Sequence, residues 1–464
     1  MNIESSRCGQ GWSMRLTECL NESDVRALQR IAAHYEEDFH SSSKMSLIQG
    51  IVAGMGRRTE ICRRIEDFPP LMKDVVVALA CEREVWSAED LRALVGRVFG
   101  QGVEWREVAD RVMERGWMFP LRSSRSQVLY HLPDEVRDGV RQWLREKSRK
   151  GAEHVPEPLV WKDESLAIVR DTAVFLAYVG RREPELTGEG VLYRRHQQQI
   201  FQLMEIREEP LAPVTWRFGY GRRFYDYPDR FAMIYDFCYA KGYVEEGPER
   251  LALGARAREW LARSDGEKWK EMFSFWRHLY RRAIPELPMA LIWLSEACAQ
   301  GWVREDRLDA LLVPYVQGYY YEDAETVKHR RIYAMLVHFG LLQCGTGEDG
   351  RRVYRRSEMA GGPWTVGDEP RVSEESRGIV VQPHFEILVE PRWVARLALD
   401  LGTFAEPVSG EGFPVYRLTR RSVRGAVDRG WSGADMVNWL RRHCRHEVPG
   451  NVETQILQWA KGPS

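Results

Sequence analysis

The chain has 464 residues, too many for one ordinary hydrophobic core, and two to four domains are therefore expected. Hydrophobic residues make up 44% of it, which excludes a wholly disordered chain. The formal net charge of −1 excludes a surface that is basic throughout, so any nucleic-acid contact must come from local patches. No apolar run is long enough for a signal peptide or a membrane span, and we expect a cytoplasmic protein without a membrane partner.

The sequence offers no motif for catalysis or for metal binding. Its eight cysteines are scattered without a CxxC pair, and "HCRH" at 443–446 lacks a fourth ligand at a suitable spacing. The phosphate loop GxxxxGK[ST], the GxSxG elbow and the HExxH helix are all missing. We therefore expect no cofactor, no metal, no catalytic residue and no small-molecule substrate, and the chain is not itself an ATP-driven motor.

Residues 1–67 are predicted to form a small helical cap. "NESDVRALQRIAAHY" predicts a helix with Asn21 as its N-cap and Asp24 three residues later. "SSSKMSLIQGIVAGM" predicts the next helix, in which we expect Leu47 and Ile48 to pack against the following domain.

The next part of the chain repeats one pattern three times. An amphipathic helix ends at Gly116, Gly242 or Gly340, where a C-cap favours a left-handed residue, and two short β-rich stretches follow. Helix, glycine and hairpin in this order are typical of the winged-helix variant of the helix-turn-helix fold, in which the hairpin is the wing. We predict three such units, at 68–148, 160–265 and 268–360.

Two linkers are predicted from composition. "REKSRKGAEHVPEP", residues 145–158, separates the first two units by its charge and prolines. The glycine-, proline- and acid-rich stretch at 361–377 marks the clearest boundary in the chain.

The third unit has the charge that DNA binding favours. In helix-turn-helix folds the last helix faces base edges in the major groove. In this unit the last helix carries Lys328, Arg330 and Arg331 without an acid, and its wing adds Arg351 and Arg352. We predict DNA contact by these five residues through neutralised phosphates, with the first two units mainly as scaffold. The alternative is that these side chains keep an exposed face solvated.

A second candidate for nucleic acid is "WRFGYGRRFYDYPDR", residues 216–230. Its six aromatic rings alternate with arginines that include Arg222 and Arg223, a composition suited to stacking unpaired bases. The preferred alternative is an ordered loop whose rings pack across the second unit. "GYYYEDAE" at 318–325 is interpreted as an ordinary surface segment.

The last part of the chain is predicted to be one compact α+β domain at 378–464. Two β-rich runs precede a helix that starts at Pro391, and Thr419 caps a further helix that ends at Gly430. Ser432 and Asp435 form a capping box for the next helix. The segment 413–446 holds eight arginines against two aspartates.

Several blocks of this domain carry a resemblance. "IVVQPHFEILVE", "FAEPVS", "VYRLTRRSVRGAVDRG", "WSGADMVNWLRRH" and "VPGNVETQILQWA" together resemble the N-terminal domain of the XPB helicase family, a module that recurs in bacterial helicase-associated proteins. Members of that family often have an acidic residue after Gln-Pro, where this chain has His384. In XPB this domain precedes two motor domains, whereas three residues follow Lys461 here.

The layout is also similar to that of the winged-helix subunit of TFIIH, whose last domain pairs with the matching domain of XPB. The resemblance implies that this chain docks on an XPB-type helicase. Val381, Phe385, Ile387 and Val389 would then form the apolar docking face, although burial inside their own domain explains the same residues.

Taken together, the sequence predicts a mainly α fold with small β elements, in which serial winged-helix units precede a compact α+β domain. We expect a non-enzymatic helicase-associated adaptor that binds DNA, an XPB-type helicase or both, in DNA repair or transcription. One alternative is a stand-alone winged-helix DNA-binding regulator. The other is an unrecognised metal-dependent nuclease, whose carboxylates would converge only in the folded chain.

Overall fold

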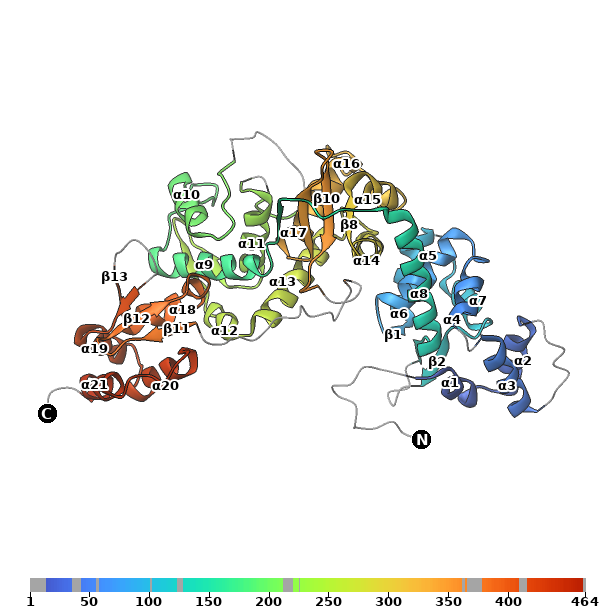
Figure 1. Cartoon of the computed structure of the whole chain (residues 1–464), viewed down its shortest axis with the longest axis horizontal. Coiled ribbons are helices and arrows are strands. Elements are labelled where there is room, and N and C mark those ends of the chain that lie inside the picture. Colours follow the sequence, from blue (N-terminus) through green and yellow to red (C-terminus); the bar gives the residue numbers. More distant parts are fainter. Residues whose placement is uncertain are drawn as a thin grey trace. The chain divides into compact units, whose positions relative to one another are not determined.

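A computed structural model of the chain describes residues 14–35, 43–55, 58–100, 102–122, 128–211, 220–224, 226–360, 364, 378–408 and 415–461 (Figure 1). Helices take up 56% of the structure and strands 13%, in small sheets, which confirms a mainly α fold with small β elements. No helix in these ranges is both long and apolar enough to cross a membrane.

The contacts divide the chain into two units. The first unit comprises Met1–Asp163, Tyr280–Ala334 and Leu342–Asp368. The second unit comprises Glu164–Leu279, Met335–Leu341 and Glu369–Ser464.

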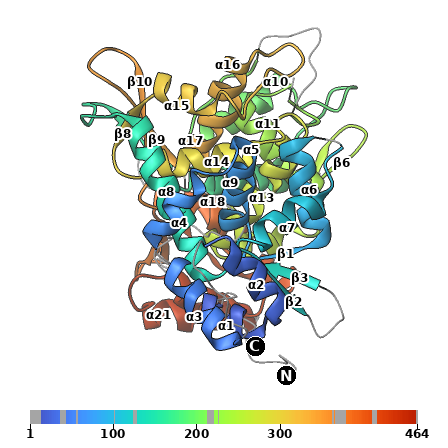
Figure 2. The ribbon, with the colours of Figure 1, turned by 90° about the vertical axis from the view of Figure 1, so that its right-hand side faces the viewer.

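The first unit begins with four short helices, of which α1, α2 and α3 lie together (Figure 2). Asn21 lies inside α1, so the predicted cap is wrong, and the Asp24 carboxylate instead accepts the Ala27 N–H at 2.8 Å. The chain breaks at Ser23, which is extended, and a new helix therefore needs its own cap. Leu47 and Ile48 are buried, as the packing prediction requires. The helices are α1 (Leu16–Glu22), α2 (Val25–Ala33), α3 (Lys44–Met55) and α4 (Arg58–Ile65).

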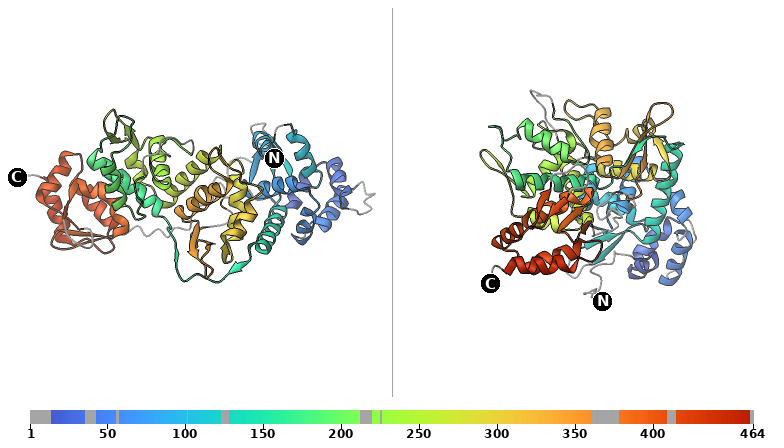
Figure 3. Two further views of the ribbon diagram at one scale, coloured as in Figure 1. Left: turned by 90° about the horizontal axis from the view of Figure 1, so that it is seen from above. Right: turned by 60° about the vertical axis from the view of Figure 1, so that its left-hand side comes forward.

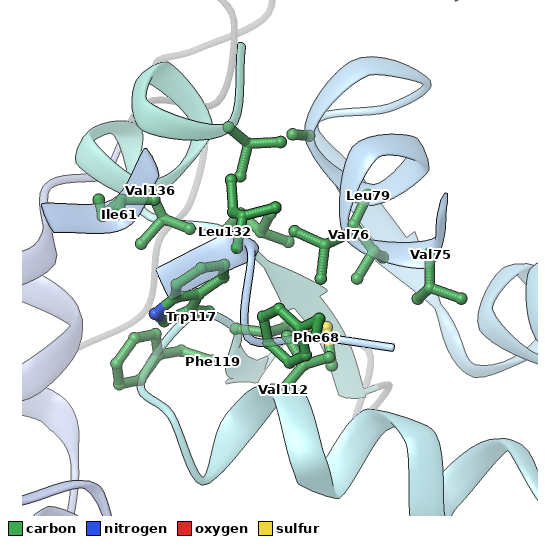
Figure 4. Close-up of a cluster of buried hydrophobic side chains, with 14 of the residues drawn as sticks. Ile61, Phe68, Val75, Val76, Leu79, Val112, Trp117, Phe119, Leu132 and Val136 are labelled. Carbon is green, nitrogen blue, oxygen red and sulfur yellow. The ribbon is translucent and has the colours of Figure 1, made fainter. Parts of the chain in front are cut away.

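These helices share a core with the elements that follow. Trp117, Phe68 and Leu132 are among the buried side chains of this cluster, to which helices and strands both contribute (Figure 4). The strands form a three-stranded sheet in the order β1-β3-β2. The elements are α5 (Pro70–Cys81), β1 (Val85–Ser87), α6 (Ala88–Phe99), α7 (Trp105–Met113), β2 (Phe119–Arg122), β3 (Val128–His131) and α8 (Asp134–Ala152).

A five-stranded sheet, ordered β4-β8-β10-β9-β5, forms the rest of the first unit. The predicted linker at 145–158 is wrong, because its first half continues α8 and its second half supplies the edge strand β4. Strand β5 covers the other edge by pairing with β9. One edge of the hairpin sheet thus finds its backbone partner inside the predicted spacer, and the other edge finds its partner just after it. The elements are β4 (His154–Val155), β5 (Trp161–Lys162), α14 (Leu287–Ala297), β8 (Trp302–Arg304), α15 (Glu305–Leu312), β9 (Leu342–Thr346) and β10 (Arg352–Arg356).

The helix between α15 and β9 is irregular. It consists of α16 (Ala324–Thr326), the π-helical segment η1 (Val327–Tyr333) and α17 (Ala334–His338). In a π-helix the hydrogen bonds span five residues, so the inward-facing positions depart from the 3.6-residue period that the sequence analysis assumed.

The second unit begins with helices that pack around a short hairpin. Its core is rich in aromatic rings, among them Phe231 at 5.2 Å and Tyr235 at 5.7 Å from Phe175, measured between ring centroids. The elements are α9 (Ala167–Arg182), α10 (Arg194–Leu203), α11 (Asp229–Ala240), β6 (Val244–Glu246), β7 (Leu251–Leu253), α12 (Ala257–Ala262) and α13 (Asp265–Tyr280).

One order of elements occurs three times along the chain: helix, extended residues, helix, helix, glycine and hairpin. Gly116, Gly242 and Gly340 have φ values of 67°, 70° and 66°, which confirms the predicted left-handed C-caps. The extended residues pair with the second half of the hairpin each time: β1 with β3, β8 with β10, and Glu185 with Arg250, directly before β7. The three segments therefore share one topology despite their unrelated sequences.

The last elements of the second unit form an α+β domain with its own core. Its sheet has the order β11-β12-β14-β13, and α20 and α21 lie side by side (Figure 3). The predicted cap at Thr419 and the predicted capping box of Ser432 with Asp435 are confirmed, as is the helix start at Pro391. The elements are β11 (Ile379–Val381), β12 (Glu386–Val389), α18 (Pro391–Phe404), β13 (Glu406–Val408), β14 (Val415–Arg417), α19 (Arg420–Asp428), α20 (Gly433–His443) and α21 (Gly450–Lys461).

Two of the C-cap glycines allow a stability test. A Cβ added at Gly340 would lie 2.1 Å from the backbone oxygen of Ser165, whereas one at Gly242 meets nothing within 4 Å. We expect Gly242→Ala to lower the free energy of unfolding by about 1 kcal/mol, the cost of a left-handed alanine. Gly340→Ala adds the steric clash and should cost about 2–4 kcal/mol. Urea unfolding of both variants checks this, and equal losses would contradict it.

Candidate nucleic-acid interface

The predicted recognition helix turns two of its three bases inward. Lys328 is buried, and its Nζ lies 3.1 Å from the Asp309 carboxylate. Asp309 also contacts His329 Nε2 at 3.1 Å and the Tyr333 hydroxyl at 2.9 Å. Burial keeps Lys328 from reaching a phosphate, so the prediction of DNA contact by this residue is wrong for this conformation.

Arg331 is also buried and paired with an acid. Its side chain is 0% exposed, and its guanidinium makes two hydrogen bonds to the Glu322 carboxylate, one of them 2.9 Å long. Arg330 is exposed, and it alone of the three predicted helix bases faces solvent. Arg331 is therefore a structural residue and not the predicted DNA contact.

The predicted wing arginines are exposed but lie beside acids of α15. Arg351 Nη1 lies 3.5 Å from Asp306, and Arg352 Nη1 lies 3.7 Å from Glu305. Charge counted along one helix and one hairpin missed these carboxylates, because they come from a neighbouring element. The local excess of positive charge that counterion release needs is thus largely cancelled here.

The arginines of the aromatic stretch also have internal partners. Arg222 binds both oxygens of Glu246 at 2.7 Å, and its guanidinium lies 4.1 Å from the centroid of the Tyr239 ring. Arg223 is buried and contacts the same carboxylate at 3.1 Å. Residues 212–219 and 225 lie outside the described residues. In the remainder the preferred packing alternative holds, since three rings are buried: Tyr220, Phe224 and Tyr227.

A buried group of charges surrounds Arg230 in the second unit. Its Nη2 lies 2.6 Å from Asp171, and its Nε lies 3.8 Å from Glu164, which also contacts His338 Nδ1 at 2.8 Å. Burial raises the pKa of the nearby Glu208 to about 7, although Arg230 lowers it. Within the part of the chain that the structure describes, no group of three His, Cys, Asp or Glu residues could hold a metal ion. The nuclease alternative therefore gains no support from this convergence of carboxylates.

The predicted docking residues lie mainly in the core of their own domain. Val381, Ile387 and Val389 are at most 5% exposed and pack with the domain's other buried side chains. Phe385 is half-buried, and its ring centroid lies 5.4 Å from that of Trp459. The first three residues therefore form no free apolar face, which favours the alternative of burial.

Helix α19 presents a face of arginines that the sequence analysis did not nominate. Arg420 and Arg421 are exposed and Arg424 is half-exposed, while Val423 and Ala426 are buried on the opposite side. Among the described residues, no carboxylate forms an ion pair with any of these three arginines. We call these three residues the α19 arginine face: Arg420, Arg421 and Arg424.

Other arginines of the same domain are neutralised. Arg417 lies 2.6 Å from Glu386, Arg441 lies 2.6 Å from Glu453, and Arg445 pairs with Glu390. The sequence signal for the α19 arginine face was the excess of eight arginines over two aspartates at 413–446. Only the fold shows which of these arginines are neutralised, because the glutamates that pair with them lie outside that segment.

The position of the α19 arginine face is costly for the helix alone. Arg420 and Arg421 occupy the first turn, where the positive end of the helix dipole favours acids and opposes cations. An anion bound at this end would meet the guanidinium groups at the positive end of the helix dipole. The arrangement is therefore suited to binding phosphate groups.

The comparisons with known proteins concern this same domain. Residues 379–462 match a family described as the helicase conserved C-terminal domain. No curated protein matches the chain. The match identifies the C-terminal region as helicase-associated and covers the α19 arginine face.

The buried Glu208 predicts a pH dependence of stability. Its folded pKa of about 7 exceeds the unfolded value of about 4.3, so the folded state binds this proton more tightly between the two values. The resulting stabilisation is complete below the unfolded pKa and is lost as the pH rises through the folded pKa. We expect the free energy of unfolding to fall by about 2–3 kcal/mol between about pH 5 and pH 8 from this group.

Urea unfolding at both pH values measures this dependence. Glu208→Gln should remove this part of the loss. Glu205→Gln is the matched control, because the Glu205 side chain is 45% exposed and bound to Arg170. A pH dependence that is the same in wild type and Glu208→Gln would contradict the assignment.

Proposed function

We propose that this chain is a non-enzymatic helicase-associated adaptor that binds DNA through the α19 arginine face and docks on an XPB-type helicase, in DNA repair or transcription. The observation that carries the proposal is the α19 arginine face itself. Among the described residues its cations have no carboxylate partner, and they lie in a region that matches a helicase domain. Arginine suits this role, since its planar fork binds phosphate oxygens in pairs.

The repeated topology supports serial winged-helix units as the scaffold of this adaptor. Each repeat has the strand pairing of a three-stranded winged helix. Because Lys328 and Arg331 are buried, the third unit lacks the exposed basic recognition helix that a stand-alone regulator would need. The regulator alternative is therefore the weaker proposal.

Docking is proposed to use the edge of the C-terminal sheet. Strand β13 pairs only with β14 among the described residues, and its three residues are exposed. An open strand edge accepts a strand from another protein through backbone hydrogen bonds, of which Pro407 in β13 can donate none. This route replaces the docking face first predicted from Val381, Ile387 and Val389, and it suits a partner domain of the same type, which would offer its own edge.

DNA binding is tested by the variant Arg420→Gln/Arg421→Gln/Arg424→Gln. Each phosphate contact contributes about 0.9 to the slope of log K against log salt, so we expect the slope for a DNA duplex to fall by about 2–3. Fluorescence anisotropy over a range of salt concentrations measures it.

The matched control is Arg417→Gln/Arg441→Gln/Arg445→Gln, which changes the net charge equally but removes arginines that are already paired. It should leave the slope within about 1 of the wild-type value. Equal effects of the two triple variants would show that only net charge matters and would remove the α19 arginine face from the proposal.

Docking is tested by affinity purification of the tagged full-length protein from its own host lysate, with and without nuclease. We expect a helicase to be recovered by the wild type, and its amount to fall several-fold for Val408→Lys, because a charge on β13 blocks strand addition. Val427→Lys is the control, since Val427 on α19 is equally exposed, at 36%. A chain ending near Glu374 should lose the helicase altogether. Recovery of DNA-dependent partners alone would end the docking proposal.

A further inference from the structure

Helix α10 of the second unit (Figure 1) contains no acidic residue. Ile200 and Phe201 are buried on the inner side of the helix. Arg194, Gln198 and Gln202 are exposed on the other side. Because each of them follows the previous one by four residues, the three side chains form one row along the helix. We call these three residues the α10 stripe.

The polar groups of the α10 stripe have no partner in the part of the chain that the structure describes. No carboxylate pairs with Arg194 there, whereas the neighbouring Arg195 binds Glu185. The side-chain amides of Gln198 and Gln202 make no hydrogen bond there. The α10 stripe therefore offers one guanidinium group and two amides to a ligand.

Two acids near the ends of α10 are already paired with basic residues. Glu185 binds Arg195 and contacts His196 Nε2 at 3.1 Å. Glu205, the first acid after the helix, accepts two hydrogen bonds from the Arg170 guanidinium, at 2.6 and 2.8 Å. These pairs reduce the repulsion that either carboxylate would exert on an anionic ligand.

Helix α10 is fixed firmly to the helices beneath it. The His196 ring contacts the Tyr178 hydroxyl of α9 at 2.7 Å. The ring centroid of Phe201 lies 5.0 Å from that of Phe231 in α11. Because these contacts hold one side of the helix, the α10 stripe on the other side keeps a defined geometry, which the recognition of bases requires.

The last helix of this helix pair cannot enter a DNA groove. In helix-turn-helix folds that helix faces base edges, but every residue of α11 from Arg230 to Cys238 is buried. Helix α10 precedes α11 in the pair and has an exposed side. Of this pair, α10 is therefore the helix that can approach DNA.

The composition of the α10 stripe suits the base edges of DNA. In the major groove glutamine pairs with adenine, and arginine binds guanine or a phosphate. A helix that docks on a protein carries apolar anchors at this spacing, whereas the exposed Tyr193 and Leu203 lie at the two helix ends, outside the stripe. The helix has 10 residues and spans about 15 Å, enough to enter a groove about 12 Å wide.

We propose that α10 lies in the major groove of duplex DNA and reads its sequence. Gln198 and Gln202 bind adenines through paired hydrogen bonds, and Arg194 in the first turn contacts a phosphate. The inference rests on the DNA binding proposed above, in which the α19 arginine face contacts phosphates and reads no bases. It adds a sequence preference and names the residues that determine it.

The spacing of the two glutamines predicts the form of the preferred site. One helical turn separates Gln198 from Gln202 by about 5.4 Å, whereas successive base pairs lie about 3.4 Å apart. The two adenines should therefore lie about one or two base pairs apart.

The test starts from a library of random DNA duplexes, from which the full-length wild type selects its preferred site. Fluorescence anisotropy then compares that site with a scrambled duplex of the same composition. We expect the wild type to prefer the selected site by at least about tenfold, since each paired contact to a base contributes about five- to 100-fold. Gln198→Ala/Gln202→Ala should reduce the preference to about twofold or less and leave binding to the scrambled duplex within about twofold.

Further variants separate base reading from charge and from surface composition. Gln29→Ala/Gln458→Ala changes exposed glutamines of α2 and α21 and should retain the preference. Arg194→Gln should weaken binding to both duplexes alike and lower the salt slope by about 1. The triple variant of the α19 arginine face should also weaken both duplexes alike, so a failure of that face and a failure of the α10 stripe give different results.

Three results would overturn the proposal. They are a wild type without sequence preference, a selected site without adenines at the expected spacing, and an undiminished preference in Gln198→Ala/Gln202→Ala. Alanine favours a helix more than glutamine does, so the melting temperature of this variant should not fall. A lower melting temperature together with a lost preference would show that the two glutamines support the fold, which would also overturn the proposal.

Discussion

A buried positive charge must meet a carboxylate, and this constraint decides which basic residues of the chain remain available for a ligand. Removing a guanidinium or ammonium from water costs several kcal/mol unless an acid and further hydrogen bonds replace the lost hydration. Arg230, Arg331 and Lys328 satisfy it through Asp171, Glu322 and Asp309. Arginines that form no ion pair with an acid remain available for a ligand. Among the described residues of the C-terminal domain these include the α19 arginine face.

The same ion pairs also organise the surface. Glu322 neutralises Arg331 in the interior and at the same time fixes the turn that exposes Tyr320 and Tyr321. A residue predicted to contact DNA thus supports a neighbouring segment whose sequence had suggested no role. The third helical repeat keeps the element order of the other two, while two of the three bases predicted on its last helix, Lys328 and Arg331, are buried.

Local features were predictable from the sequence, because residues close in the chain decide them. Short-range rules predict the left-handed glycines at 116, 242 and 340 and the hairpins that follow them. They also predict the helix caps at Thr419 and Ser432. The partners of Lys328 and Arg331 were not predictable, since charge counted along one helix omits acids on adjacent segments. The prediction of Asn21 as a cap was wrong, because Asp24 caps a second helix. The apolar side chains of Val381, Ile387 and Val389 were compatible with either a surface or a core position.

The edge strands β4 and β5 tie together parts of the chain that are far apart in sequence. Strands β4 and β5 pair with β8 and β9, and most of the chain that separates them in sequence belongs to the second unit. Loop closure of this length makes the sheet slow to form, and during synthesis it must wait until residue 356 has emerged. Strands β4 and β5 then remain without partners until β8 and β9 have been made, which begin at residues 302 and 342. The order in which the chain leaves the ribosome therefore leaves this sheet open to misfolding during that interval.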